Sequence, residues 1–211
     1  MNTANDPWLN VEHALKYLRQ ADSFPHRTEG EACLLEELPH NARRILDLGS
    51  GAGRLLKLAL TRFPDAQAVA LDHSETMLGK LRDEFGTNPN VTVVPHDMNH
   101  TLPALGVFDA VISSFAIHHS EDARKRALYG EVFEIIEHGG VFCNLEHVSS
   151  PTQNLHLAFY KALHVSIADE DANNRLLDVE SQLRWLREIG FEDVDCYWKW
   201  REMALLVGKK A

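Results

Sequence analysis

Residues 44–54 read Arg44-Ile45-Leu46-Asp47-Leu48-Gly49-Ser50-Gly51-Ala52-Gly53-Arg54, and this stretch decides the fold. Its apolar half is typical of a buried parallel strand, and three alternating glycines follow it. Glycine adopts positive φ cheaply and lets a ligand approach the main chain. The spacing fits neither a dinucleotide fingerprint, which needs glycine at position 54, nor a P-loop, which ends in Gly-Lys-Ser/Thr. The stretch predicts a strand, a ligand-binding loop and a helix over about residues 55–63; a tight turn without a ligand is the alternative.

This loop resembles motif I of the class I S-adenosylmethionine-dependent methyltransferases, Asp/Glu-x-Gly-x-Gly-x-Gly, through Asp47, Gly49, Gly51 and Gly53. The resemblance implies an α/β fold with a Rossmann-like, doubly wound, seven-stranded sheet. That sheet is mostly parallel, with an antiparallel last strand, N-terminal helices and an insertion helix after the fifth strand. It also implies S-adenosyl-L-methionine as the cofactor, with Ser50 among the loop residues that bind it.

The composition predicts one soluble domain over residues 1–211. With 45% hydrophobic residues, the chain builds one substantial core but is short for two domains. The net charge of -10 disfavours nucleic acid as a partner. The three cysteines form no Cys-x-x-Cys pair, and no apolar window approaches the length of a membrane span or a signal sequence. We therefore expect a cytoplasmic protein with no membrane partner.

Acidic residues end two further predicted strands, and parallel strands bring their carboxyl ends to one edge. Asp72 follows the strand at 67–71 at about the 20-residue spacing of a ribose-binding carboxylate. By resemblance, Asp97 accepts from the adenine amino group after the third strand, at 91–94. The resemblance also assigns cofactor-binding positions to His73, Met77, Met98 and Ser114. Met77 as an ordinary core residue remains an alternative.

The segment before the glycine loop is expected to cover the cofactor. Residues 1–9 are polar, and we expect them to form a mobile arm. Helices are predicted near 11–18 and 28–38. Residues from 1 to about 40 would then form a cap over the cofactor. In related methyltransferases an arginine in this segment often pairs with the methionyl carboxylate. Arg27 is the candidate, because a guanidinium matches a carboxylate bidentately. A solvated arginine at a helix start is the alternative.

Five residues near the carboxyl-edge loops are candidate catalytic bases: His118, His119, Glu146, His147 and Tyr160. Neighbouring residues of an extended segment point in opposite directions, which favours one pocket-facing histidine, His119. The chain contains twelve histidines, which suggests a metal site as an alternative, with His118, His119, Glu146 and His147 as ligands. The spacing of these residues matches no known metal-binding motif. The prediction is therefore no resident metal.

The pattern of alternating parallel strands and helices breaks over about 151–178, where apolar residues from Leu155 to Ile167 predict an amphipathic insertion helix. Related enzymes carry a substrate lid at this place. Trp198 and Trp200 lie on the same face of a predicted strand. We expect them to pack on the last helix or to form part of a homodimer surface.

We predict transfer of the cofactor's methyl group to an oxygen or nitrogen of a small metabolite, assisted by a loop histidine. The alternatives are a wobble-uridine-modifying sulfonium transferase of the same fold, a metal-assisted methyltransferase and a non-catalytic sulfonium-binding protein.

Overall fold

The computed structural model describes residues 8, 10–21 and 24–211. In this part of the chain seven strands form one sheet, in the order β3-β2-β1-β4-β5-β7-β6. The strands are β1 (Arg44–Leu48), β2 (Gln67–Asp72), β3 (Val91–Pro95), β4 (Phe108–Ser114), β5 (Ile136–His147), β6 (Glu192–Trp200) and β7 (Met203–Lys209). The pairings are parallel except for the two that β7 makes. The predicted doubly wound sheet with an antiparallel last strand is confirmed.

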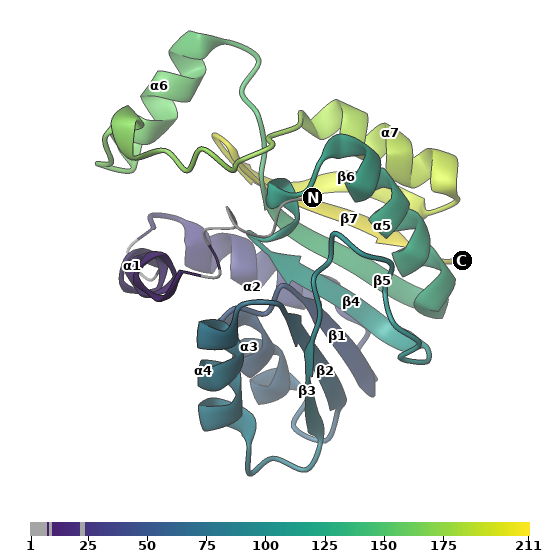
Figure 1. Ribbon diagram of the computed structural model, residues 1–211. Helices are drawn as coiled ribbons and strands as arrows, with labels where there is room; N and C mark the ends of the chain where they lie inside the picture. Colours follow the sequence, from purple (N-terminus) through teal and green to yellow (C-terminus); the bar gives the residue numbers. More distant parts are fainter. Residues whose placement is uncertain (1–7, 9, 22–23) are drawn as a thin grey trace.

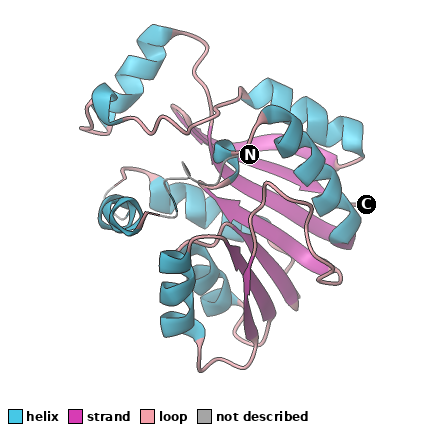
Figure 2. Ribbon diagram, viewed as in Figure 1, coloured by secondary structure: helices cyan, strands magenta, loops and turns pink. Residues whose placement is uncertain are grey.

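Helices cover both faces of this sheet (Figures 1 and 2). They are α1 (Val11–Ala21), α2 (Arg27–Glu37), α3 (Arg54–Arg62), α4 (Glu75–Phe85), α5 (Asp122–Ile135), α6 (Gln153–Ala162) and α7 (Val179–Ile189). Two short 3-10 helices, η3 (Ile117–His119) and η4 (Ile167–Asp169), lie in the loops after β4 and α6. In the described part of the chain no helix is long and apolar enough to cross a membrane.

Strand alternation divides the core between the two faces. In β1, Ile45 belongs to the apolar cluster formed with α2, α3 and α4, whereas Leu46 and Leu48 join the cluster formed with α5 and α7. All three side chains are fully buried. Because successive side chains of a strand point to opposite faces, the central strands are apolar on both sides. The sheet is thus held rigidly between two helical layers, and its carboxyl edge is left for the loops.

The loop after β1 needs its glycines. Gly49, Gly51 and Gly53 all have positive φ, at 68°, 56° and 86°. A Cβ on Gly49 would collide with Ala116, and one on Gly53 would collide with the ring of Phe85. The chain therefore passes from β1 into α3 close against its neighbours, and side chains are excluded at positions 49 and 53.

Two local predictions are wrong. The insertion helix was expected to run from Leu155 to Ile167, but α6 ends at Ala162 and η4 follows after a short turn. The tryptophans of β6 do not pack on α7, which lies on the opposite face. Trp198 lies against Gly30 of α2, and Trp200 stacks on His26 with ring centroids 4.6 Å apart. The order of strands β5, β7 and β6 places the face of β6 that carries both tryptophans over α2. The spacing of residues in the sequence does not reveal the order of strands in a sheet.

A pair of glycine substitutions tests the loop geometry. Gly53→Ala is expected to lower the free energy of unfolding by about 1–3 kcal/mol, because alanine disfavours positive φ and its Cβ meets Phe85. Gly79→Ala, within α4, adds a Cβ that meets nothing within 4 Å, and we expect it to be neutral or stabilising by ~0.5–1 kcal/mol. Urea unfolding without added ligand measures both. Equal stabilities of the two variants would contradict the account.

Candidate functional site

Two cavities lie side by side beyond the carboxyl edge of the sheet. The first, of about 230 Å³, is lined by the glycine loop and the ends of β2 and β4, and we call it the glycine-loop cavity. The second, of about 440 Å³, is lined by His118, His119 and His147 and by α6 with the segment after it, and we call it the histidine cavity. Trp8, Phe115 and His119 line both. The two cavities therefore adjoin at these three side chains.

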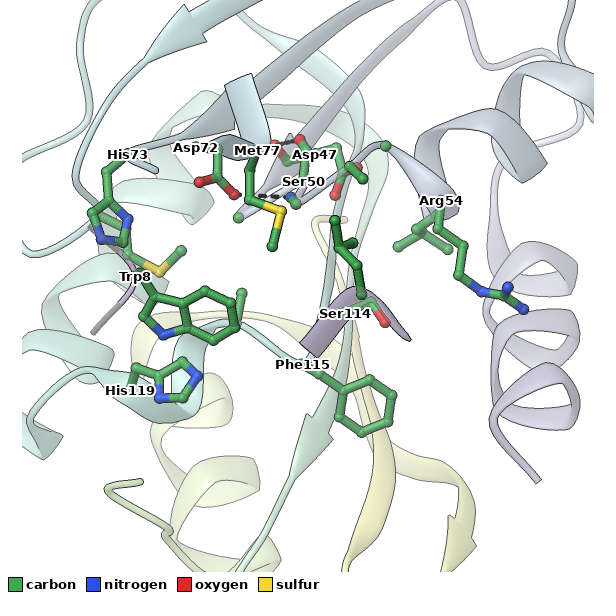
Figure 3. Close-up of a pocket in the computed structure, with 18 of the residues that line it drawn as sticks. Trp8, Asp47, Ser50, Arg54, Asp72, His73, Met77, Ser114, Phe115 and His119 are labelled. Atoms are coloured by element: carbon green, nitrogen blue, oxygen red, sulfur yellow. Dashed lines mark hydrogen bonds between the residues drawn. The ribbon is translucent and has the colours of Figure 1, made fainter. Parts of the chain in front are cut away.

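Every residue predicted to bind the cofactor lines the glycine-loop cavity. They are Arg27, Asp47, Gly49, Ser50, Gly51, Gly53, Asp72, His73, Met77, Asp97, Met98 and Ser114. The carboxyl ends of parallel strands meet at one edge, so positions far apart in sequence converge there. Figure 3 shows Asp47, Asp72, Met77 and Ser114 around the same space. Their individual roles in binding remain predictions.

Asp72 connects the strand ends to the glycine loop. Its Oδ2 accepts a hydrogen bond from the Gly51 amide at 2.8 Å, and its Oδ1 accepts one from the Ser74 amide at 2.8 Å. The side chain is nearly buried, and desolvation raises its pKa. These two amides fix the carboxylate at the cavity wall, where its remaining lone pairs are available to hydroxyl donors.

Asp47 supplies a buried carboxyl oxygen that can still accept a hydrogen bond. Its Oδ2 is buried and has no hydrogen-bond partner among the residues that the structure describes. Desolvation raises the pKa of this carboxyl to about 7. Buried polar atoms are almost always hydrogen-bonded, so an unsatisfied carboxyl oxygen in a cavity indicates a bound donor. The methionyl ammonium of S-adenosylmethionine is a donor that matches it, so the residues present fit this cofactor.

Arg27 is buried, and the alternative of a solvated arginine is wrong. Its Nε donates to Glu31 at 2.9 Å, and the same carboxylate accepts from the Nε and one terminal nitrogen of Arg54, each at 2.8 Å. Glu31 is 1% exposed. Both arginines line the glycine-loop cavity, and one buried carboxylate orients them. Glu31 and Arg54 escaped the sequence analysis because nothing in their spacing showed that α2 crosses the start of α3.

Trp8 is a further residue that sequence reasoning missed. It falls in the arm predicted to be mobile, of which residues 1–7 and 9 lie outside the described part. Its carbonyl accepts from the Ser74 hydroxyl at 2.7 Å, and its ring lies edge-on to His119 with centroids 5.3 Å apart. Figure 3 shows the indole beside His119 at the mouth of the glycine-loop cavity. A lone tryptophan near a chain end carries no sequence signal for this position.

His118 and His119 both line the histidine cavity, so the prediction that only one faces a pocket is wrong. That prediction assumed an extended segment, whereas the two residues lie in the 3-10 helix η3. Adjacent residues of a helical turn are about 100–120° apart, and both side chains reach one side. His119 is nevertheless the histidine that lines both cavities.

His118 and Glu146 form a buried acid-base pair. Nδ1 of His118 lies 2.6 Å from Oε1 of Glu146, and the two residues are 6% and 1% exposed. Burial lowers the pKa of His118 well below its usual range, and burial raises the pKa of Glu146 to about 7. Such a pair titrates as a unit and takes up its first proton near neutrality. Glu146 itself does not line the cavity, whereas its partner His118 does.

Polar residues behind this pair hold Glu146 in place. Its Oε2 accepts from Nδ2 of Asn144 at 3.3 Å, and the same nitrogen lies 3.2 Å from the Tyr129 hydroxyl. That hydroxyl donates to Oε1 of Gln182 at 2.6 Å. The network joins β5, α5 and α7 inside the core, and Oδ1 of Asn144 is its one member without a partner among the described residues.

The remaining predicted bases, His147 and Tyr160, also line the histidine cavity. Nε2 of His147 lies 3.0 Å from the buried carboxylate of Glu202, which also lies 3.0 Å from Nδ1 of His156 on α6. Burial raises the pKa of Tyr160 far above its usual value, so this phenol is a donor, not a base, at neutral pH. Within the described chain, no three His, Cys, Asp or Glu side chains are arranged to hold a metal ion.

Residues 45–140 match the model of a family described as a methyltransferase domain. A malonyl-[acyl-carrier protein] O-methyltransferase of Legionella pneumophila is 38% identical over 119 residues, which are 53% of this chain and 42% of that protein. A trans-aconitate 2-methyltransferase of Acidovorax ebreus is 32% identical over 116 residues, 54% of this chain and 43% of that protein. The chain thus spans less than half the length of these two relatives.

Solved structures share the whole fold. Human N-acetylserotonin methyltransferase in complex with S-adenosylmethionine superposes with a TM-score of 0.69 at 16% identity, covering 97% of this chain and 58% of that one. At this identity the likeness concerns the fold alone. The sheet order, the glycine loop and the matched domain agree with one another. Residues 45–140 thus match a methyltransferase domain, and the fold around them is one that S-adenosylmethionine-dependent methyltransferases share.

Proposed function

We propose that this protein transfers a methyl group from S-adenosylmethionine to an oxygen or nitrogen of a small molecule held in the histidine cavity. The observation that carries the proposal is the junction of the two cavities at Trp8, Phe115 and His119. Transfer of a methyl group requires the acceptor and the cofactor to meet in line at short distance, and such positioning contributes ~7–11 kcal/mol in favourable cases. Phe115 adopts a φ of 52°, uncommon for a bulky residue, which is typical of backbone held in place at a functional site.

The glycine-loop cavity is the proposed cofactor site. Asp72 would accept from the ribose hydroxyls, Asp47 from the methionyl ammonium, and Arg27 with Arg54 would face the methionyl carboxylate. When bound, the cofactor supplies a methyl group on a cationic sulfur whose leaving form is a neutral thioether. The protein therefore has to position and desolvate the acceptor and to remove its proton.

The His118-Glu146 pair is the proposed proton acceptor. With Glu146 ionised, its carboxylate stabilises the imidazolium that forms when His118 takes a proton. Burial raises the pKa of Glu146 to about 7. Above this pH the pair is deprotonated and can accept a proton from the acceptor molecule. Burial and the neighbouring His118 lower the pKa of His119 to about 3, and because its ring lines both cavities we assign it to lining the junction.

The segment from α6 to residue 174 is the proposed lid of the acceptor site. It contributes Phe159, Tyr160 and Leu163 to the wall of the histidine cavity. Figure 1 shows α6 standing away from the helical layers. The lid is tied down at its far end, where the Arg175 amide donates to the His118 carbonyl at 2.8 Å. This link couples the position of the lid to the catalytic pair.

Cofactor binding tests the function at its base. Calorimetric titration of the wild type with S-adenosylhomocysteine is expected to give a saturable 1:1 isotherm. Asp72→Ala is expected to weaken binding at least about ten-fold, since hydrogen bonds to a charged group contribute ~1.5–3 kcal/mol. Asp65→Ala, an exposed aspartate in the turn after α3, is the control and should bind as the wild type does. Absence of binding by the wild type would refute the proposal.

Nuclear magnetic resonance of the histidine rings tests the catalytic pair without an acceptor. The ring nitrogens of His118 are expected to shift with an inflection near pH 7 as the pair takes up its proton. In Glu146→Gln this inflection is expected to disappear between pH 6 and 8, because burial alone keeps the pKa of His118 low. The ring signals of the exposed His100 should not differ between the two proteins. An unchanged His118 inflection in the variant would rule out the pairing.

A further inference from the structure

We propose that the acceptor is a small molecule carrying a protonated amine beside an aromatic or aliphatic ring, and that its amine nitrogen receives the methyl group. This inference rests on the proposed function and names the acceptor class for the same site. The evidence for it is the negative charge of the histidine cavity and the apolar and aromatic side chains that line the cavity.

Acidic side chains outnumber fixed cations in that cavity. Asp169, Glu170 and Asp171 line it at the end of η4, whereas Lys16 is the single Lys or Arg side chain that the described residues place in its wall. The side chains of Glu170 and Asp171 are 29% and 22% exposed, so water only partly screens them. A ligand in the cavity therefore experiences a net negative wall.

Neighbouring groups leave this charge largely uncompensated. Asp171 accepts from the amide and side-chain nitrogens of Asn173, each at 2.9 Å, and these donors are neutral. Nε2 of His13, which also lines the cavity, lies 3.5 Å from Oδ2 of Asp171. Oε2 of Glu170 lies 3.3 Å from Nε2 of His156, whose pKa is raised by Glu202 and Glu170 together. One imidazolium between two carboxylates still leaves a negative charge.

The histidines at the inner end add no positive charge at neutral pH. Burial lowers the pKa values of His118 and His119, and both imidazoles are neutral there. Nδ1 of His119 is buried and has no hydrogen-bond partner in the described chain, so it is free to meet an acceptor group at the junction. A carboxylate at this place would be buried without a cation, which costs several kcal/mol.

The rest of the wall suits the body of such an amine. Phe24, Phe159 and Tyr160 line it together with the apolar Leu163 and Val165. The rings of Phe159 and Tyr160 meet edge to face, with centroids 5.6 Å apart, so that a ring face remains for a ligand. Aromatic faces attract ammonium groups through the negative charge of the ring face, and they attract no carboxylate.

The reaction balances with the groups on hand. The entering ammonium gives one proton to the His118-Glu146 pair, and the nitrogen's freed lone pair forms the bond to the methyl carbon. The electron pair of the broken carbon-sulfur bond stays on sulfur. The product is a methylated ammonium with the thioether, and the pair returns its proton to water. No oxidant or further reactant is required.

Matched ligands on one skeleton test the inference. The wild type saturated with S-adenosylhomocysteine is titrated calorimetrically with 2-phenylethylamine, 2-phenylethanol and 3-phenylpropionate. We expect the amine to bind at least about ten-fold more tightly than the carboxylate, with the alcohol between them. In Glu170→Gln and Asp171→Asn the preference should fall several-fold, whereas Asp65→Asn, which loses the same charge on the distant surface, should retain it.

The outcomes separate the two proposals. Failure of S-adenosylhomocysteine to bind overturns the function itself. Binding of S-adenosylhomocysteine with equal or tighter binding of 3-phenylpropionate, or with no difference among the three probes, overturns the amine assignment and leaves the function standing. A preference for the amine that Glu170→Gln and Asp171→Asn do not reduce also overturns it. Thermal unfolding of each variant checks that the fold is kept.

Discussion

The carboxylate of Asp72 holds the functional edge of this protein together. Its two oxygens accept from the amides of Gly51 and Ser74, so one side chain joins the end of β2, the glycine loop and the start of α4. The loop can adopt this path only because Gly49 and Gly53 have positive φ and no Cβ. The sheet below is fixed between two apolar layers, and the position of the loop follows from that rigidity.

Two further buried carboxylates organise the side chains around this edge. Glu31 orients Arg27 and Arg54 on the cofactor side, and Glu146 orients His118 on the acceptor side. Both are 1% exposed, where an unpaired charge would be costly, and each is satisfied by close donors. A buried carboxylate with a fixed partner holds that partner in one geometry, which a catalytic or binding group requires.

The histidine cavity differs in character from the glycine-loop cavity. Much of its wall comes from segments added to the sheet, namely the N-terminal region, α6 and the chain after it, and η3 with the ends of β5 and β7 completes it. Loops of this kind carry specificity on a rigid scaffold. Under the proposed function, the scaffold places an acceptor near His119, and the acids and rings of the added segments select which acceptor enters. The family match over residues 45–140 includes neither the N-terminal region nor α6, so it carries no information on these segments.

The sequence by itself determined the sheet, the glycine loop and the cofactor-side residues, because strand period, glycine spacing and acids at strand ends are local signals. Asp47, Asp72 and Asp97 could be assigned to one edge from the chain alone. Only the tertiary structure decided that His118 meets Glu146, 28 positions away, and that Glu31 meets Arg54, 23 positions away. It likewise placed Trp8 at the junction and put both histidines of η3 on one side. Such contacts depend on how helices cross and how loops fold back, and side-chain burial that shifts a pKa exists only once those elements have packed.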